Sequence, residues 1–242
     1  MTGIYKFAGK LIEVNSLYGL VHDYCAEYRA EGEPDFSVTT TREDIEHERV
    51  SNARSSEREG MIRHNSSDEQ LEELAVYRKI AEQMPRYGTF LFHGSCVAVD
   101  GEGYLFTAKS GTGKSTHTGL WREMLGERAV MVNDDKPLIT AAAEGIVIHG
   151  TPYNGKHRLG CNISVPLKAV CLLERAETNT IRRISRAEAY PMLIAQTYRP
   201  NDGAALAATL PLIDRMADNV ALYRLGCNMA PDAAKVAYEG MK

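Results

Sequence analysis

A glycine-rich loop between a predicted strand and a predicted helix constrains the fold of this chain more than any other feature. The strand is predicted for residues 104–107 and the helix for 116–125, and the intervening loop reads Ala108-Lys-Ser-Gly-Thr-Gly-Lys-Ser115. This is the P-loop pattern, with an alanine in place of its first glycine. Its glycines let several backbone N–H groups face one anion, and the dipole of the next helix adds to that attraction. The loop predicts a phosphate site within an α/β fold.

The residue types of the loop indicate which phosphates it binds. Lys114 is expected to reach the β- and γ-phosphates, and the hydroxyl of Ser115 to hold Mg²⁺. ATP and Mg²⁺ are therefore the expected ligands, and a glycine-rich turn with a surface lysine is the alternative. The residues expected to bind the nucleotide are Ser110, Gly111, Thr112, Gly113, Lys114, Ser115 and Thr116.

Two adjacent carboxylates, Asp134 and Asp135, follow the next predicted strand at residues 129–132. In P-loop proteins an acidic residue at such a strand end approaches the metal from the side opposite the loop. Two neighbouring carboxylates suggest two roles, one on Mg²⁺ and one as a base that takes a proton from an acceptor hydroxyl. The alternative is a turn whose carboxylates are exposed to solvent.

Composition excludes several classes of function. The formal charge of −4 over 242 residues argues against a surface built to bind nucleic acid. No apolar run has the length of a membrane span, and the first residues lack the apolar stretch of a signal peptide. The five cysteines are scattered without a CxxC pair, which favours buried thiols in a reducing cytoplasm over a zinc site or disulfides. We therefore expect a cytoplasmic protein.

The periodicity of apolar residues predicts a mixed α/β chain with two parts. Residues 1–85 form an N-terminal α+β annex, and residues 86–242 form the catalytic core. Within the annex, residues 39–70 are charged and polar, and they predict a mobile connection or flap, or alternatively a polar hairpin arm.

Several motifs of the core, taken in order, resemble the HPr kinase/phosphorylase catalytic domain. They are Phe92-His-Gly-Ser95, the turn at Gly101-Glu-Gly103, the loop at 108–116, and Asn133-Asp-Asp135. The loop is also similar to that of phosphoenolpyruvate carboxykinases. The resemblance covers roughly residues 90–140 and implies an HPr-kinase/carboxykinase-like P-loop core.

The resemblance also implies a role for each matching side chain. Asp134 resembles the catalytic base, and Asp135 resembles a second acid at the metal. His93 resembles the histidine that contacts the base and tunes its protonation. A structural histidine at a strand end is the alternative for His93.

The chain departs from that family at two places. Thr116 stands where the family has a glutamate, and the glycine- and arginine-bearing signature associated with HPr contact is not recognisable. In its place lies the basic loop 150–160, in which Lys156 or Arg158 is expected to neutralise charge on the transferred phosphoryl group. Ordinary surface cations at a hairpin tip are the alternative.

The sequence therefore predicts an ATP- and Mg²⁺-dependent phosphotransferase, with Asp134, His93 and Lys156 as catalytic residues and Ser115 and Asp135 at the metal. The expected acceptor is a small hydroxyl compound or a peptide serine. Neither nucleic acid nor a membrane is expected as a partner, and an oligomer remains open. Two alternatives are a nucleotide-binding regulatory ATPase module and a phosphoenolpyruvate carboxykinase-like lyase.

Overall fold

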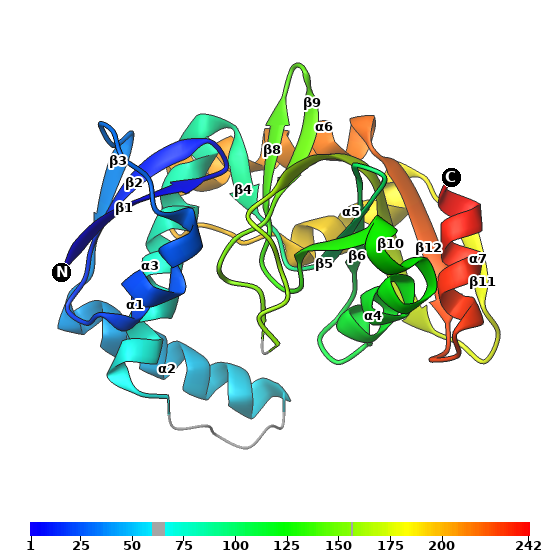
Figure 1. Ribbon diagram of the computed structural model, residues 1–242, viewed down its shortest axis with the longest axis horizontal. Helices are drawn as coiled ribbons and strands as arrows, with labels where there is room; N and C mark the ends of the chain where they lie inside the picture. Colours follow the sequence, from blue (N-terminus) through cyan, green and yellow to red (C-terminus); the bar gives the residue numbers. More distant parts are fainter. Residues whose placement is uncertain (60–65, 156) are drawn as a thin grey trace. The chain divides into compact units, whose positions relative to one another are not determined.

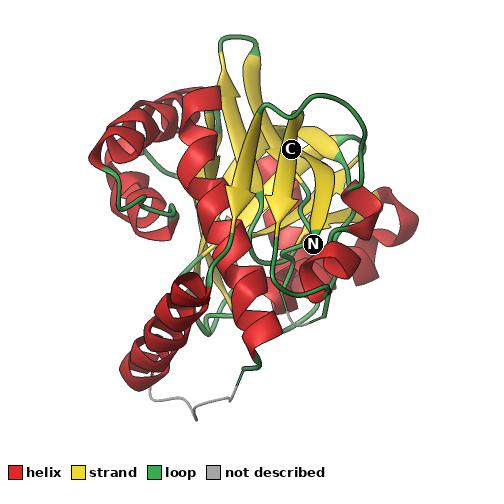
Figure 2. Cartoon of the chain, turned by 90° about the vertical axis from the view of Figure 1, so that its left-hand side faces the viewer, coloured by secondary structure: helices red, strands yellow, loops and turns green. Residues whose placement is uncertain are grey.

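The computed structural model describes residues 1–59, 66–155 and 157–242. It divides into two compact units, Met1–Gln83 and Met84–Lys242. Both units contain helices and strands, so the chain has the mixed α/β fold that the sequence predicts (Figure 2). Across the described residues, no helix combines the length and the apolarity that a membrane crossing requires.

The first unit contains a sheet with the strand order β1-β2-β3 (Figure 1). Strands β1 (Thr2–Phe7) and β2 (Lys10–Asn15) form an antiparallel hairpin, and β3 (Phe36–Thr39) pairs with β2 in parallel. A parallel pair cannot be joined by a tight turn. The chain between β2 and β3 accordingly contains helix α1 (Leu20–Tyr24) and the 3₁₀ helix η1 (Ala26–Tyr28).

Helix α2 (Arg42–Glu59) occupies much of the segment for which the sequence predicts a flap or a hairpin arm. It contacts helix α3 (Asp68–Gln83) through Arg78, whose guanidinium lies 2.6 Å from Glu48 and 3.1 Å from Asp44. Charged side chains of α2 thus contact α3, although composition alone predicts that they face solvent. The predicted flap contains a regular helix because these ion pairs hold it against α3.

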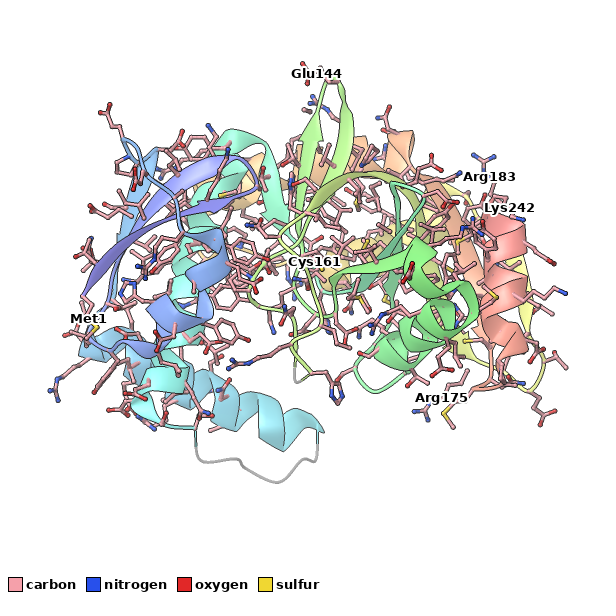
Figure 3. All side chains as sticks on the ribbon, in the orientation of Figure 1. Met1, Glu144, Cys161, Arg175, Arg183 and Lys242 are labelled. Carbon is pink, nitrogen blue, oxygen red and sulfur yellow. The ribbon has the colours of Figure 1, made fainter. Side chains whose placement is uncertain are left out.

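The second unit is built on a mixed sheet with the order β4-β8-β9-β10-β6-β5-β7, in which β12 pairs with β10 and β11 with β12. β10 is parallel to β6 and β12 but antiparallel to β9. Glu144 marks the tip of the β8–β9 hairpin (Figure 3). The strands are β4 (Thr89–Leu91), β5 (Ser95–Val99), β6 (Glu102–Thr107), β7 (Ala129–Asn133), β8 (Leu138–Ala142), β9 (Gly145–His149), β10 (Ser164–Arg175), β11 (Thr180–Arg183) and β12 (Ala221–Cys227).

Helices cover both faces of this sheet because its central strands carry apolar side chains on both sides. Along β6, Leu105 joins the core beneath α5 and α6, whereas Tyr104 and Phe106 join the core beneath α4 and α7. Side chains of a strand alternate between faces, so a strand buried on both faces is apolar at consecutive positions. The helical elements are η2 (Met84–Tyr87), α4 (Lys114–Leu125), η3 (Gly126–Arg128), α5 (Arg186–Gln196), α6 (Gly203–Asn219) and α7 (Asp232–Met241).

Strand directions bring two of the predicted motifs to one edge of the sheet. β5 is antiparallel to both β6 and β7, so β6 and β7 run in the same direction. The P-loop follows β6 and the paired aspartates follow β7. Their meeting place is therefore the edge formed by the carboxyl ends of these strands, where α/β sheets bind ligands.

Candidate nucleotide-binding site

The P-loop takes a backbone conformation that its glycines permit. Gly111 and Gly113 have φ angles of 72° and 115°, in the left-handed region that strains other residues. Gly113 is the N-cap of α4, and its carbonyl accepts the N–H of His117 at 2.9 Å. The N–H groups of the first turn of α4 lack partners within the helix. They are available for an anion at this helix end.

Ala108 shows why an alanine is tolerated at the first position of the pattern. Its side chain is buried, with 1% exposed, and its backbone lies outside the left-handed region. The position therefore requires a small residue and not specifically a glycine. Lys114 lies back across the loop, with its Nζ 3.4 Å from the carbonyl oxygen of Ala108.

Arg175 secures the loop from the end of a neighbouring strand (Figure 3). Its Nη2 donates to the carbonyl oxygen of Gly111 at 2.6 Å. β10 is parallel to β6, so the ends of both strands lie at the same edge of the sheet. Arg175 was not among the site residues predicted from the sequence. A cation two positions beyond the apolar run at residues 169–173 was the available signal.

A cavity of about 480 Å³ brings together most of the predicted site residues. It joins the P-loop, both aspartates and His93, with Gly155 and His157 from the loop 150–160. Lys156 lies outside the described residues. Thr112 does not line this cavity but a second one, described below. The lining residues are His93, Ser110, Gly111, Gly113, Lys114, Ser115, Thr116, Asp134, Asp135, Gly155 and His157.

Asp134 is the more buried of the two carboxylates, with 5% of its surface exposed. Ser95 Oγ donates to its Oδ1 at 2.6 Å. Burial raises the pKa of Asp134, and the charge of Asp135 adds to the effect, whereas hydrogen bonds from Ser95 and Ser115 oppose it. A carboxylate with a raised pKa is a stronger proton acceptor than an ordinary one.

Asp135 has the opposite electrostatic character. Burial opposes its ionisation, but the hydrogen bond from His93 and the charge of Lys136 outweigh burial and hold the pKa of Asp135 well below its usual range. Lys136 Nζ contacts Oδ2 of Asp135 directly. Asp135 therefore stays ionised wherever the protein is folded at ordinary pH, as a metal ligand must.

The position of His93 corrects the expectation taken from the resemblance. His93 Nε2 lies 3.4 Å from Oδ1 of Asp135, not beside the expected base Asp134. Asp134 instead points toward Ser95 and Ser115. Consecutive side chains at a strand end diverge, so one histidine pairs with one of two neighbouring carboxylates.

Asn133 joins the aspartates to the loop 150–160. Its Nδ2 donates to Oγ1 of Thr151 at 2.9 Å, and its Oδ1 accepts the N–H groups of Asp135 and Lys136 at 2.9 and 2.7 Å. Gly150 is required nearby, because a Cβ there would lie 1.8 Å from the carbonyl oxygen of Cys161. The start of the loop is thus anchored to the site, whereas His157 and Arg158 near its tip are exposed.

The donor set suits Mg²⁺. A serine hydroxyl and carboxylate oxygens are hard ligands, and Mg²⁺ is commonly held by one or two carboxylates together with substrate phosphates and water. Within the described ranges, no group of three or more His, Cys, Asp or Glu forms a separate metal cage. Ser115 and Asp135 are the residues that would hold the ion.

We expect His93→Ala to impair metal binding at acidic pH. Loss of the hydrogen bond from His93 removes an influence that lowers the pKa of Asp135, so that pKa rises. As pH falls, Asp135 then becomes protonated at a higher pH than in the parent. Titration of Mg²⁺ in the presence of ATP, repeated from pH 7 down to about pH 3.5, measures the effect. An unchanged acid limit combined with a lower melting temperature would support a purely structural histidine.

Comparison with known proteins identifies the family. The family model for "SynChlorMet cassette protein ScmC" matches residues 63–200, more than half of the chain. The chain belongs to this ScmC family. No curated protein matches it significantly.

Among solved structures, the Hpr(Ser) kinase/phosphatase from Coxiella burnetii is similar with a TM-score of 0.38 and 10% identity. The similarity covers 62% of this chain and 94% of that one.

Proposed function

We propose that this member of the ScmC family is a phosphotransferase that moves the γ-phosphoryl group of ATP to a hydroxyl, with Mg²⁺ as cofactor. The observation that carries the proposal is the convergence, in one cavity, of Lys114 and Ser115 with a buried carboxylate, Asp134, whose pKa is raised. A site that only binds nucleotide needs the first two residues but not a buried base beside them.

The residues divide the chemistry between binding and proton transfer. Lys114 and the N–H groups at the start of α4 hold the phosphates, and Ser115 and Asp135 hold the metal. When bound, Mg²⁺ neutralises charge on the β- and γ-phosphates. Asp134 accepts the proton of the acceptor hydroxyl while the acceptor oxygen bonds to the γ-phosphorus. The bond from that phosphorus to the β-bridging oxygen breaks, and ADP leaves with the electron pair.

His157 supports the proposal that the acceptor is a small hydroxyl compound or a peptide serine. It lines the same cavity as Asp134, and its charge lowers the pKa of that carboxyl. A compact polar group of this kind suits a ligand that makes few contacts. A folded protein partner ordinarily needs about 800 Å² of buried surface on each side.

The proposed location of the protein is a reducing cytoplasm, which suits the exposed thiol of Cys161.

The test is a transfer assay with γ-labelled ATP and three acceptor sets. The sets are a metabolite panel, a serine-peptide library and a cell extract fractionated by size. We expect label on a small compound or a peptide, and transfer slowed by about 10²-fold or more with Asp134→Asn. Label found only on large proteins would contradict the acceptor class.

Two other outcomes would contradict the reaction itself. Label found only in inorganic phosphate would indicate a regulatory ATPase. Decarboxylation of oxaloacetate dependent on nucleotide would indicate a lyase.

A further inference from the structure

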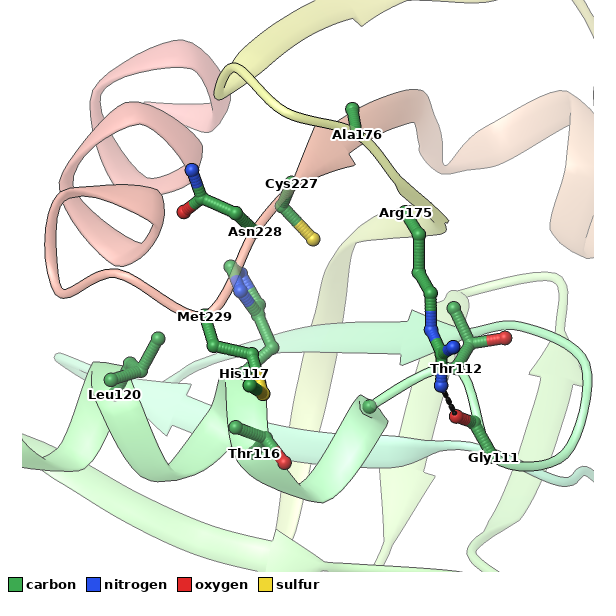
Figure 4. A pocket seen from close by; sticks show the side chains of 11 residues that line it. Gly111, Thr112, Thr116, His117, Leu120, Arg175, Ala176, Cys227, Asn228 and Met229 are labelled. Atoms are coloured by element: carbon green, nitrogen blue, oxygen red, sulfur yellow. Dashed lines mark hydrogen bonds between the residues drawn. The ribbon is translucent and has the colours of Figure 1, made fainter.

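A second cavity, of about 490 Å³, adjoins the phosphate site at the P-loop (Figure 4). Both cavities are lined by Gly111, Gly113 and Thr116. The aspartates line the first cavity and not the second. The aspartates are expected to face the γ-phosphate. The second cavity therefore lies toward the opposite end of a bound triphosphate, where the α-phosphate would leave the loop.

The walls of this cavity are largely apolar. Leu120 comes from α4, whereas Cys227 and Met229 come from the end of β12 and the segment after it. Met229 is unusually exposed for a large apolar side chain, at 79%. Apolar walls with a few directed polar groups are characteristic of sites for small organic ligands. The phosphates alone do not account for such walls.

His117 supplies a polar group that the protein itself leaves without a partner. Its side chain is buried, with 3% of the residue exposed, and its Nδ1 forms no hydrogen bond with any described residue. Its side chain rises from α4 into the cavity (Figure 4). A buried polar atom without a partner destabilises the protein, so a bound ligand that satisfies it gains affinity.

The hydrogen bond at the other ring nitrogen determines what Nδ1 requires. Trp121 Nε1 lies 3.1 Å from His117 Nε2. An indole N–H only donates, so His117 Nε2 accepts and carries no proton. Burial lowers the pKa of His117 to about 4, which keeps the ring neutral at ordinary pH. The single proton of the ring is therefore on Nδ1, a buried donor without a hydrogen-bond partner among the described residues.

We propose that this cavity binds the purine base of the nucleotide whose phosphates occupy the P-loop, with His117 Nδ1–H donating to a ring nitrogen of the base. The inference rests on the proposed function. A purine matches each feature of the cavity: an aromatic two-ring face for Leu120 and Met229, and ring nitrogens that accept hydrogen bonds. Arg175, already bonded to Gly111, lies at the junction of the cavity and the loop, where the sugar would pass.

The experiment compares two ligands that share the phosphates and differ in the base. Calorimetry with ATP and with inorganic tripolyphosphate, each with Mg²⁺, gives a ratio of affinities for the whole chain. We expect the parent to bind ATP at least about tenfold more tightly than tripolyphosphate. His117→Phe keeps an aromatic ring but removes the N–H donor. It is therefore expected to weaken the affinity for ATP about five- to tenfold and to leave the affinity for tripolyphosphate unchanged.

Two further variants make the comparison specific. His149→Phe is the matched control, since His149 is also a buried histidine but both of its nitrogens have partners, Thr140 and Ser164. It is expected to keep the parental ratio. Ala176→Trp fills the cavity from an exposed position and tests the same site if His117→Phe fails to fold. It is expected to remove the advantage of ATP over tripolyphosphate.

The outcomes separate this inference from the proposed function. Equal affinities of the parent for ATP and tripolyphosphate would overturn the base site while leaving the phosphate site intact. An equal loss of affinity for both ligands in His117→Phe would also overturn the base site. So would an unchanged ratio of the two affinities in Ala176→Trp. If neither ligand binds the parent, the phosphate site fails, and the proposed function fails with it.

Discussion

Asp134→Asn is expected to slow phosphoryl transfer by about 10²-fold or more while ATP and Mg²⁺ still bind. Asparagine has nearly the shape of aspartate, and its side-chain oxygen can still accept from Ser95 Oγ, which lies 2.6 Å from Asp134 Oδ1. The substitution thus removes the proton acceptor with little change in packing. Calorimetry for binding, together with single-turnover transfer of labelled phosphate to the identified acceptor, separates the two effects.

The pH dependence of transfer gives a second readout of Asp134. A base must be unprotonated, and burial raises the pKa of Asp134, so the rate should fall as pH decreases through that raised value. Ser95→Ala removes a hydrogen bond that lowers this pKa. Its acid limb should therefore move to higher pH, with transfer retained at alkaline pH. Normal turnover by Asp134→Asn would refute the assignment of the base.

Lys114→Ala is expected to weaken ATP binding on the order of 10²-fold. The variant removes a cation that the P-loop aims at the β- and γ-phosphates, and a hydrogen bond to a charged group contributes about 1.5–3 kcal/mol. Low exposure strengthens the effect, since only 9% of Lys114 is exposed and solvent screens it little. Calorimetric titration with ATP and Mg²⁺ measures the loss.

Lys109→Ala is the matched control for this prediction. Lys109 lies in the same loop, but it is exposed and does not line the phosphate cavity. Its removal should change ATP affinity less than about threefold, the range expected for an exposed charge. Similar losses in the two variants would mean that the loop attracts anions only through its general charge.

Local sequence was sufficient to predict the elements that form the phosphate loop. A strand before Ala108, glycines at 111 and 113, and a helix after Lys114 specify a tight turn from contacts within a few residues. The same holds for Asp134 and Asp135 at the end of a buried strand. The pattern of apolar residues predicted a mixed α/β chain for the same reason.

The sequence pattern was a less reliable guide to structure where charged residues make the contacts between helices. The segment 39–70 has the composition of a flap, yet Asp44 and Glu48 of α2 bind Arg78 of α3. These partners are 34 and 30 positions apart in the chain. No local window contains both members of such a pair, so polarity alone predicted a mobile connection, a flap or a hairpin arm.

The environment of each catalytic candidate was decided by tertiary structure. Ser95 meets Asp134 from 39 positions away, and Arg175 meets Gly111 from 64. His93 and Asp135 are adjacent only because antiparallel strands return the chain to one edge of the sheet. A pKa depends on burial and on neighbours in space, so the raised value of Asp134 and the lowered value of Asp135 follow from packing.

The sequence alone thus determined which residue types were present for phosphate and metal chemistry and the turn that displays them, because both depend on short stretches of chain. Only the tertiary structure decided which carboxylate is buried, which one pairs with His93, and that His117 lines a largely apolar cavity beside the loop. Those properties arise where strands and helices distant in sequence exclude water together.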